Sequence, residues 1–135
     1  MDNRKTDDQM SPGFTLEWSE PDGRTRKETG TAEVKREDEV TRIIGTIRPA
    51  LHFLVLNIPR ELGETGKYPI VTFDEGQEGK PSVTIGSVLE GAWLTDFHGF
   101  VTLTKQGKFI VEFEAESIGS NYKIHKGSFV LDLDS

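Results

Sequence analysis

The chain has 135 residues and a formal net charge of −7, and its 14 glycines suit a β protein with many turns. A chain of this length forms one domain with a core of its own. The acidic balance leaves no basic surface for phosphate groups, so it excludes nucleic acid as an expected partner. The sequence contains no cysteine, which excludes disulfides, thiolate metal sites and a cysteine nucleophile. No apolar run reaches the ~20 residues of a membrane span.

The first twelve residues are polar and mixed in charge, and Ser11-Pro12-Gly13 ends them. Such a segment buries too little apolar surface to offset the entropy of ordering, so residues 1–12 are predicted to be a disordered leader. Residues 13–135 are then the single folded domain. The N-terminus has no hydrophobic signal core. A periplasmic or envelope location is expected if an export signal was removed, and a cytoplasmic one otherwise.

The folded part opens with a predicted strand in which Phe14, Leu16 and Trp18 alternate with polar residues. Trp18 is expected to be a core anchor rather than a ligand platform. The turn sequence Pro21-Asp22-Gly23 follows, and then a basic cluster of Arg24, Arg26 and Lys27. Acidic residues flank this cluster closely, so it is predicted to be a solvated hairpin rather than a site for an anion.

The run from Leu51 to Ile58, LHFLVLNI, is apolar at nearly every position. It indicates a strand covered on both faces or a central strand of the packed sheet, with a buried helix as the competing interpretation. Its Phe, Val and Ile content and the proline at position 59 favour the strand. Residues 59–67 then form a predicted loop that has room for a single helical turn, and residues 74–81 form an exposed acidic loop.

The clearest two-residue periodicity lies between Gly99 and Leu133. Phe109, Val111 and Phe113 alternate with glutamates, so one face should be apolar and the other acidic. Four strands are predicted here, with turns at 106–107, 119–121 and 126–127. Together these patterns predict an all-β fold, an antiparallel β-sandwich or a closed barrel-like meander of about nine to eleven short strands.

From about Val40 onward, a series of motifs resembles an uncharacterised all-β domain of bacterial envelope lipoproteins. The motifs are LHFLVLNI, Gly66-Lys67-Tyr68, GFVTLT at 99–104, FIVEFEA at 109–115 and Gly127-Ser128-Phe129. They cover roughly two-thirds of the chain and consist of turn and core positions. The resemblance implies a β-sandwich at a bacterial surface or in the periplasm. It carries no catalytic residues, and the lipidated cysteine with which such proteins begin is absent here.

Few residues of the sequence suggest a catalytic or metal-binding site. The three histidines His52, His98 and His125 lack the spacing of a zinc site, and the aspartates near the C-terminus lack the spacing of a calcium loop. No metal or other cofactor is therefore expected. Asp96 and His98 could form a general-base pair, but no nucleophile elbow or phosphate loop accompanies them. The protein is accordingly predicted not to be an enzyme.

The segment from Trp93 to His98 is the predicted binding region, with Trp93, Asp96 and His98 as its site residues. If it is one strand, Asp96 and His98 lie on one face, and Trp93 and Phe97 lie on the other. With loops 59–67 and 74–81 it would form an envelope-associated module that binds a small surface ligand or another protein. The alternative is a small acidic inhibitor or immunity-type protein that masks a basic partner protein.

Overall fold

The computed structural model describes residues 11–48, 52–63, 65–76 and 82–132. These residues form a sheet of ten strands, one 3-10 turn and one short helix. The strands are β1 (Ser11–Ser19), β2 (Thr25–Arg36), β3 (Val40–Ile47), β4 (His52–Pro59), β5 (Gly66–Ile70), β6 (Thr84–Leu89), β7 (Ala92–Leu94), β8 (Phe97–Gln106), β9 (Lys108–Ser117) and β10 (Lys123–Asp132). The 3-10 turn η1 spans Arg60–Leu62, and the helix α2 spans Phe73–Gly76.

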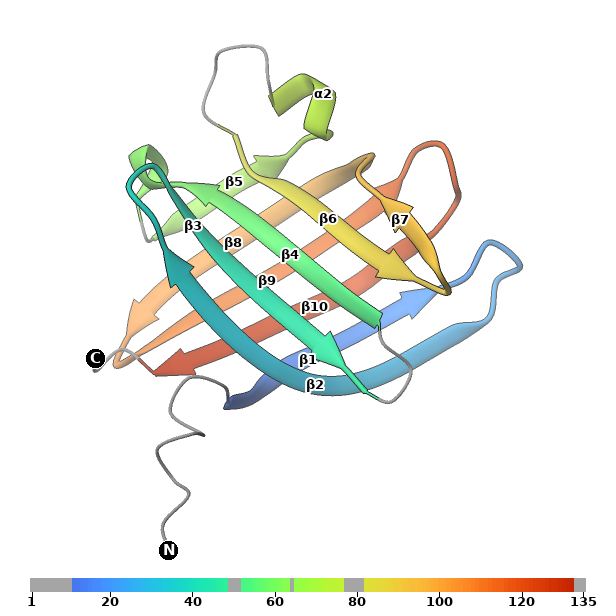
Figure 1. The fold of residues 1–135 in the computed structure, drawn as a ribbon, viewed down its shortest axis with the longest axis horizontal. Coiled ribbons are helices and arrows are strands. Elements are labelled where there is room, and N and C mark those ends of the chain that lie inside the picture. The colour runs from blue at the N-terminus through green and yellow to red at the C-terminus, as the bar shows by residue number, and fades with distance from the viewer. Residues whose placement is uncertain (1–10, 49–51, 64, 77–81, 133–135) are drawn as a thin grey trace, which may run out of the picture.

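All ten strands belong to one sheet in the order β5-β8-β9-β10-β1-β2-β3-β4-β6-β7, and each neighbouring pair is antiparallel. The prediction of an all-β antiparallel fold with nine to eleven strands is confirmed. The sheet curls into a half-barrel, in which β3, β4, β6 and β7 lie in front of β8, β9, β10 and β1 and the long β2 bends between the two layers (Figure 1). An isolated parallel bridge between Ile70 and Val83 joins the ends of β5 and β6.

The core lies on the inner face of the curled sheet. The rings of Phe14 and Phe129 stack with their centroids 4.7 Å apart, and Phe113 adds a third ring 5.9 Å from Phe129. Gly45 of β3 lies directly under the ring of Phe14, because a Cβ there would come within 2.5 Å of it. Trp18 is fully buried, so its prediction as a core anchor is confirmed.

Strand β9 shows the predicted alternation. Phe109, Val111 and Phe113 point into the core, while Glu112 and Glu114 are exposed on the outer face. The predicted turn at 126–127 is wrong, because Gly127 lies inside β10, which runs unbroken from Lys123 to Asp132. The register shifts between Ile124 and Gly127, and a Cβ at Gly127 would come within 2.1 Å of the Phe113 ring. This glycine is therefore required for ring packing and not for a turn.

Strand β4 confirms the strand interpretation of the apolar run, and η1 is the single helical turn for which the loop at 59–67 has room. The short helix α2 occupies the start of the predicted acidic loop, of which residues 77–81 lie outside the described residues. Strand β1 already begins at Ser11. The predicted disorder of residues 1–10 stays a prediction, because they too lie outside the described part. Within that part, no helix is long and apolar enough to cross a membrane.

Candidate functional site

The outer face of β4 is the starting point of the candidate site. His52, Leu54, Leu56 and Ile58 point inward and are buried, whereas Phe53, Val55 and Asn57 point outward and are half-buried. The register places Val55 opposite Gly86 of β6, and Phe53 opposite Val88 of the same strand. Apart from Asn57, the outer face of this part of the sheet is therefore apolar, although the described residues form no second sheet that covers it.

Trp93 of β7 lies on this outer face, opposite Val88. Its indole ring extends over Gly86, since a Cβ on that glycine would come within 2.6 Å of the ring. The ring also contacts Phe53 at a centroid distance of 6.1 Å and Phe73 of α2 at 6.3 Å. Even so, 56% of Trp93 is exposed. One side of the indole therefore packs on the sheet and the rest is open to solvent.

A groove of about 470 Å³ runs beside Trp93, and we name it the outer-face groove. Its apolar lining comes from two aromatic and three aliphatic residues, Phe73, Trp93, Val40, Val55 and Pro59. Its polar lining is Arg42, Asn57, Ser82 and Thr84. This volume and this mostly apolar lining with a few polar groups are typical of sites for small ligands.

The polar groups of the outer-face groove form a row across three strands. Arg42 of β3 is the register partner of Asn57 of β4, which in turn pairs with Thr84 of β6. The Asn57 side-chain amide donates a hydrogen bond of 3.2 Å to the Thr84 hydroxyl. One terminal nitrogen of Arg42 forms an ion pair with Glu37, and both side chains are about half exposed. The row therefore offers hydrogen-bonding groups but little net charge.

Helix α2 forms one wall of the groove and is attached to the sheet at three points. The Phe73 ring packs edge-on against Trp93, and the Phe73 backbone N–H donates to the Thr95 carbonyl at 3.1 Å. The His98 Nε2 atom lies 2.5 Å from Glu75 Oε1. This contact, and a hydrogen bond from the Thr72 backbone N–H, hold the pKa of Glu75 below its ordinary value. His98 thus positions a wall of the groove without lining it.

The structure separates the three predicted site residues. Residues 93–98 are not one strand, because β7 ends at Leu94 and β8 begins at Phe97. Leu94 and Phe97 are both buried, so the alternation changes phase between the two strands. The prediction that Trp93 and Phe97 share a face is therefore wrong, because Phe97 is buried in the core and Trp93 is exposed. Of the three, Trp93 alone lines the outer-face groove.

Asp96 has a structural role at the loop between β9 and β10. One carboxylate oxygen accepts a hydrogen bond of 2.9 Å from the Ser117 hydroxyl, and the other accepts one of 2.7 Å from the Gly119 backbone N–H. The Asp96 carbonyl also accepts from the backbone N–H of Ile118. Both of its oxygens are therefore bonded to this loop, while His98 bonds to α2. The two residues do not form a catalytic pair.

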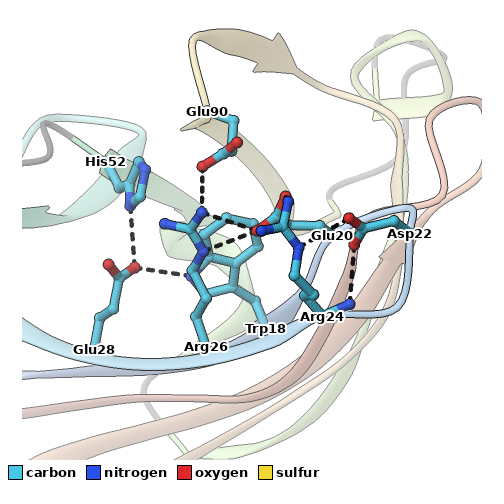
Figure 2. A network of polar contacts seen from close by, with 8 residues as sticks. All are labelled: Trp18, Glu20, Asp22, Arg24, Arg26, Glu28, His52 and Glu90. Carbon is cyan, nitrogen blue, oxygen red and sulfur yellow. Dashed lines mark hydrogen bonds and ion pairs between the residues drawn. The ribbon is translucent and has the colours of Figure 1, made fainter.

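A second cluster, which we name the Trp18 network, lies where the β1–β2 hairpin meets the turn between β6 and β7 (Figure 2). The Trp18 indole N–H donates to Glu28 at 2.9 Å, and His52 Nδ1 lies 3.0 Å from the same carboxylate oxygen. The Arg26 guanidinium lies over the Trp18 ring at 5.3 Å. It forms ion pairs of 2.9 Å with Glu20 and 2.7 Å with Glu90.

The hairpin extends this network. Glu20, only 7% exposed, also accepts from Arg24, whose Nε donates to Asp22 at 2.9 Å. The Arg24 backbone N–H holds the pKa of Asp22 below its ordinary value, and the bond to Glu20 raises the pKa of Arg26. The prediction that the basic cluster is a solvated hairpin is therefore wrong for Arg26, which is half-buried inside an ion-pair network. No buried side-chain polar atom of the described residues lacks a hydrogen-bond partner, so we assign this network to structure.

The outer face on the other side of the half-barrel carries an exposed phenylalanine, Phe100, with the Lys67 ammonium 5.1 Å from its ring. Two hollows of about 350 and 550 Å³ flank this ring, and both are also lined by Glu114 and His125. Glutamates and lysines are mixed there, with Glu116 opposite Lys123. The surface is charged and more polar than the outer-face groove.

The described residues contain no group of three or more His, Asp or Glu side chains that could hold a metal ion. His52 bonds to Glu28, His98 to Glu75, and His125 to the Ser19 hydroxyl. The three histidines thus lie in three different places. The expectation that no cofactor is bound remains a prediction.

Sequence reasoning found Trp93 and, in the predicted loop 59–67, Pro59, but missed the other residues of the groove. The sequence held one indication of the groove. The run LHFLVLNI is apolar on both faces, so the face that does not point into the core must be partly exposed or covered by another element. The row of Arg42, Asn57 and Thr84 had no such signal, because its members are 15 and more residues apart in the chain. Comparison with family models, with curated proteins and with solved structures found no match.

Proposed function

We propose that this protein is a non-enzymatic binding module that takes a small ligand into the outer-face groove. The observation that carries the proposal is Trp93, which is 56% exposed beside a groove of about 470 Å³. A large aromatic side chain left half open to solvent on a rigid strand is typical of a recognition surface. The curled sheet, in this proposal an open barrel-like meander rather than a sandwich, acts as the scaffold.

Two features support a rigid, preformed site. Trp93 is held by Gly86 below and by Phe53 and Phe73 at its sides, so its ring loses little conformational freedom when a ligand binds. Asn57 lies on β4, which pairs with β3 on one side and β6 on the other, and Thr84 is the register partner of Asn57 on β6. A bacterial envelope location, which the lipoprotein resemblance implies, is part of the same proposal.

The absence of a catalytic constellation in the described residues favours binding over catalysis. Asp96 and His98 each have a structural partner, and the His52–Glu28 pair lies in the Trp18 network, where His52 is 4% exposed. A general base must reach its substrate, and these groups do not face a common cavity.

The experiment is a screen of a small-molecule fragment library by two-dimensional NMR of the ¹⁵N-labelled protein. The two indole N–H signals are separate reporters, because Trp93 lines the groove and Trp18 is buried. We expect bound fragments to shift the Trp93 signal in a saturable way and to leave the Trp18 signal unchanged. If no fragment shifts the Trp93 signal, the groove is not a ligand site and the proposal fails.

A second candidate function, masking of a basic partner protein, is favoured by the exposed row of Glu112, Glu114 and Glu116 on β9. We rank it below ligand binding, because Lys67, Lys123 and Lys126 line the same hollows and offset the acidic charge. Charge reversal at Glu114 would abolish binding to a basic partner if this second function is correct, and it would not change binding at Trp93.

A further inference from the structure

We propose that the ligand of the outer-face groove is a neutral sugar ring, presented by an oligosaccharide. This inference rests on the proposed function and adds the chemical class of the ligand. It depends on three properties of the groove, namely a flat open indole, a row of hydrogen-bonding side chains beside it, and the neutrality of that row.

The indole of Trp93 offers a flat apolar platform. Its far edge lies over Gly86, where even a Cβ would come within 2.6 Å of the ring, Phe53 and Phe73 contact the ring at its sides, and 56% of the residue is exposed. The face of an aromatic ring carries partial negative charge, which attracts the weakly positive C–H groups of an apolar ligand face. A pyranose ring has such a C–H face, so it can stack on Trp93.

The polar row lies where the edge of a stacked ring would extend. Arg42, Asn57 and Thr84 are successive register partners on β3, β4 and β6, so their side chains stand in line across the outer face. A guanidinium has five N–H donors, an amide has donors and an acceptor, and a hydroxyl has both. Sugar hydroxyl groups donate and accept in the same way, so a row of this composition suits them.

The charge of the groove argues against the main alternatives. Arg42 is the one charged residue among its described lining, and Glu37 already neutralises it. An anionic ligand would have to compete with Glu37 and approach a chain of net charge −7. A cationic ligand would meet the Arg42 guanidinium. A neutral ligand with both an apolar face and a polar edge has neither penalty.

The test is a microarray of neutral and acidic glycans probed with the full chain, with affinities then measured by titration in solution. We expect binding to one or more neutral glycans and weaker or no binding to their uronic-acid counterparts. Trp93→Ala should weaken that binding by at least about tenfold, because the stacking platform is lost. Phe100→Ala is the matched control, an exposed aromatic on the opposite outer face, and should leave affinity unchanged.

The polar row is tested separately with Asn57→Ala. We expect a 2- to 10-fold loss of affinity, the usual contribution of one hydrogen bond, and a small drop in melting temperature because the bond to Thr84 is lost. Thr102→Ala, an exposed hydroxyl on β8, is the control and should have no effect. If Asn57→Ala and Thr102→Ala bind equally well, the row does not contact the ligand and the proposal fails.

Other outcomes overturn the sugar while leaving the groove in place. Binding of apolar or charged fragments at Trp93, with no neutral glycan bound, would refute the ligand class and keep the proposed function. A dimer that forms in a concentration-dependent way and is abolished by Trp93→Ala would make the groove a contact between two copies of the chain. A Trp93 signal that responds to nothing would refute both proposals.

Discussion

The two tryptophans of this chain show how differently one fold can use the same side chain. Trp18 is completely buried, its N–H bonds to Glu28 and its ring lies beneath Arg26. Trp93 is 56% exposed, and its ring lies on a glycine of the neighbouring strand. A buried ring whose N–H has a hydrogen-bond partner indicates a structural anchor, whereas an exposed ring on a rigid support indicates a ligand-binding surface. The difference lies in what surrounds each ring, because both residues are on strands of the same sheet.

The largest effect is expected from Trp18→Ala, which should lower the free energy of unfolding by about 3–5 kcal/mol, the usual cost of emptying a large buried site. The change also removes the indole N–H that donates a hydrogen bond to Glu28, and it removes the ring over which the Arg26 guanidinium lies. Urea unfolding followed by circular dichroism measures it. Trp18→Phe, which keeps a ring and loses the N–H, should cost less. A loss below about 1 kcal/mol for Trp18→Ala would show that the Trp18 network does not stabilise the fold.

A pair of glycine substitutions extends the comparison to the residues beneath two rings. Gly45→Ala should cost about 1–3 kcal/mol, because its Cβ would come within 2.5 Å of the buried Phe14 ring, which has no room to move. Gly86→Ala should cost less, about 1 kcal/mol or less, because its Cβ would push the far edge of the Trp93 ring off the sheet, which loses the contacts with Phe53 and Phe73 but no core packing. Thermal unfolding of both variants decides the matter, and equal losses would show that Trp93 is as constrained as Phe14.

Trp93→Ala should lower stability by about 1 kcal/mol or less, because its ring contributes contacts to Phe53 and Phe73 and buries less than half of its surface. The same urea series measures the change, with Trp18→Ala as its reference. A loss of 3 kcal/mol or more would place Trp93 in the core and remove the argument for a recognition surface.

The smallest effect concerns acid. The contact with His98 lowers the pKa of Glu75, so its carboxylate favours the folded state at every pH where it is charged. This contribution is present above the ordinary glutamate pKa of about 4.3 and is lost as the pH falls through the lower folded value. Glu75→Gln should therefore flatten the acid side of a stability–pH profile slightly. Asp74→Asn, on the same helix, is the control, and an equal flattening by both would contradict the role of His98.

The amino-acid sequence by itself determined the all-β class and which side chains of the clearest strands face the core. Phe109, Val111 and Phe113 alternate with exposed glutamates because a strand turns successive side chains to opposite faces. Local sequence also identified β4, from its composition and the proline at 59, and left room for the single turn η1. It failed at Gly127, where a glycine in a strand and a glycine in a turn look alike along the chain, and the close approach of the Phe113 ring decides between them.

Tertiary structure alone decided which residues form the candidate site. The break between β7 and β8 changes the alternation, so the predicted partners Trp93, Asp96 and His98 diverge to the groove, to the loop between β9 and β10, and to α2. The row of Arg42, Asn57 and Thr84 exists because three strands pair in a particular register. Strand pairing joins positions that are distant in the chain, and periodicity within one strand carries no information about its neighbours.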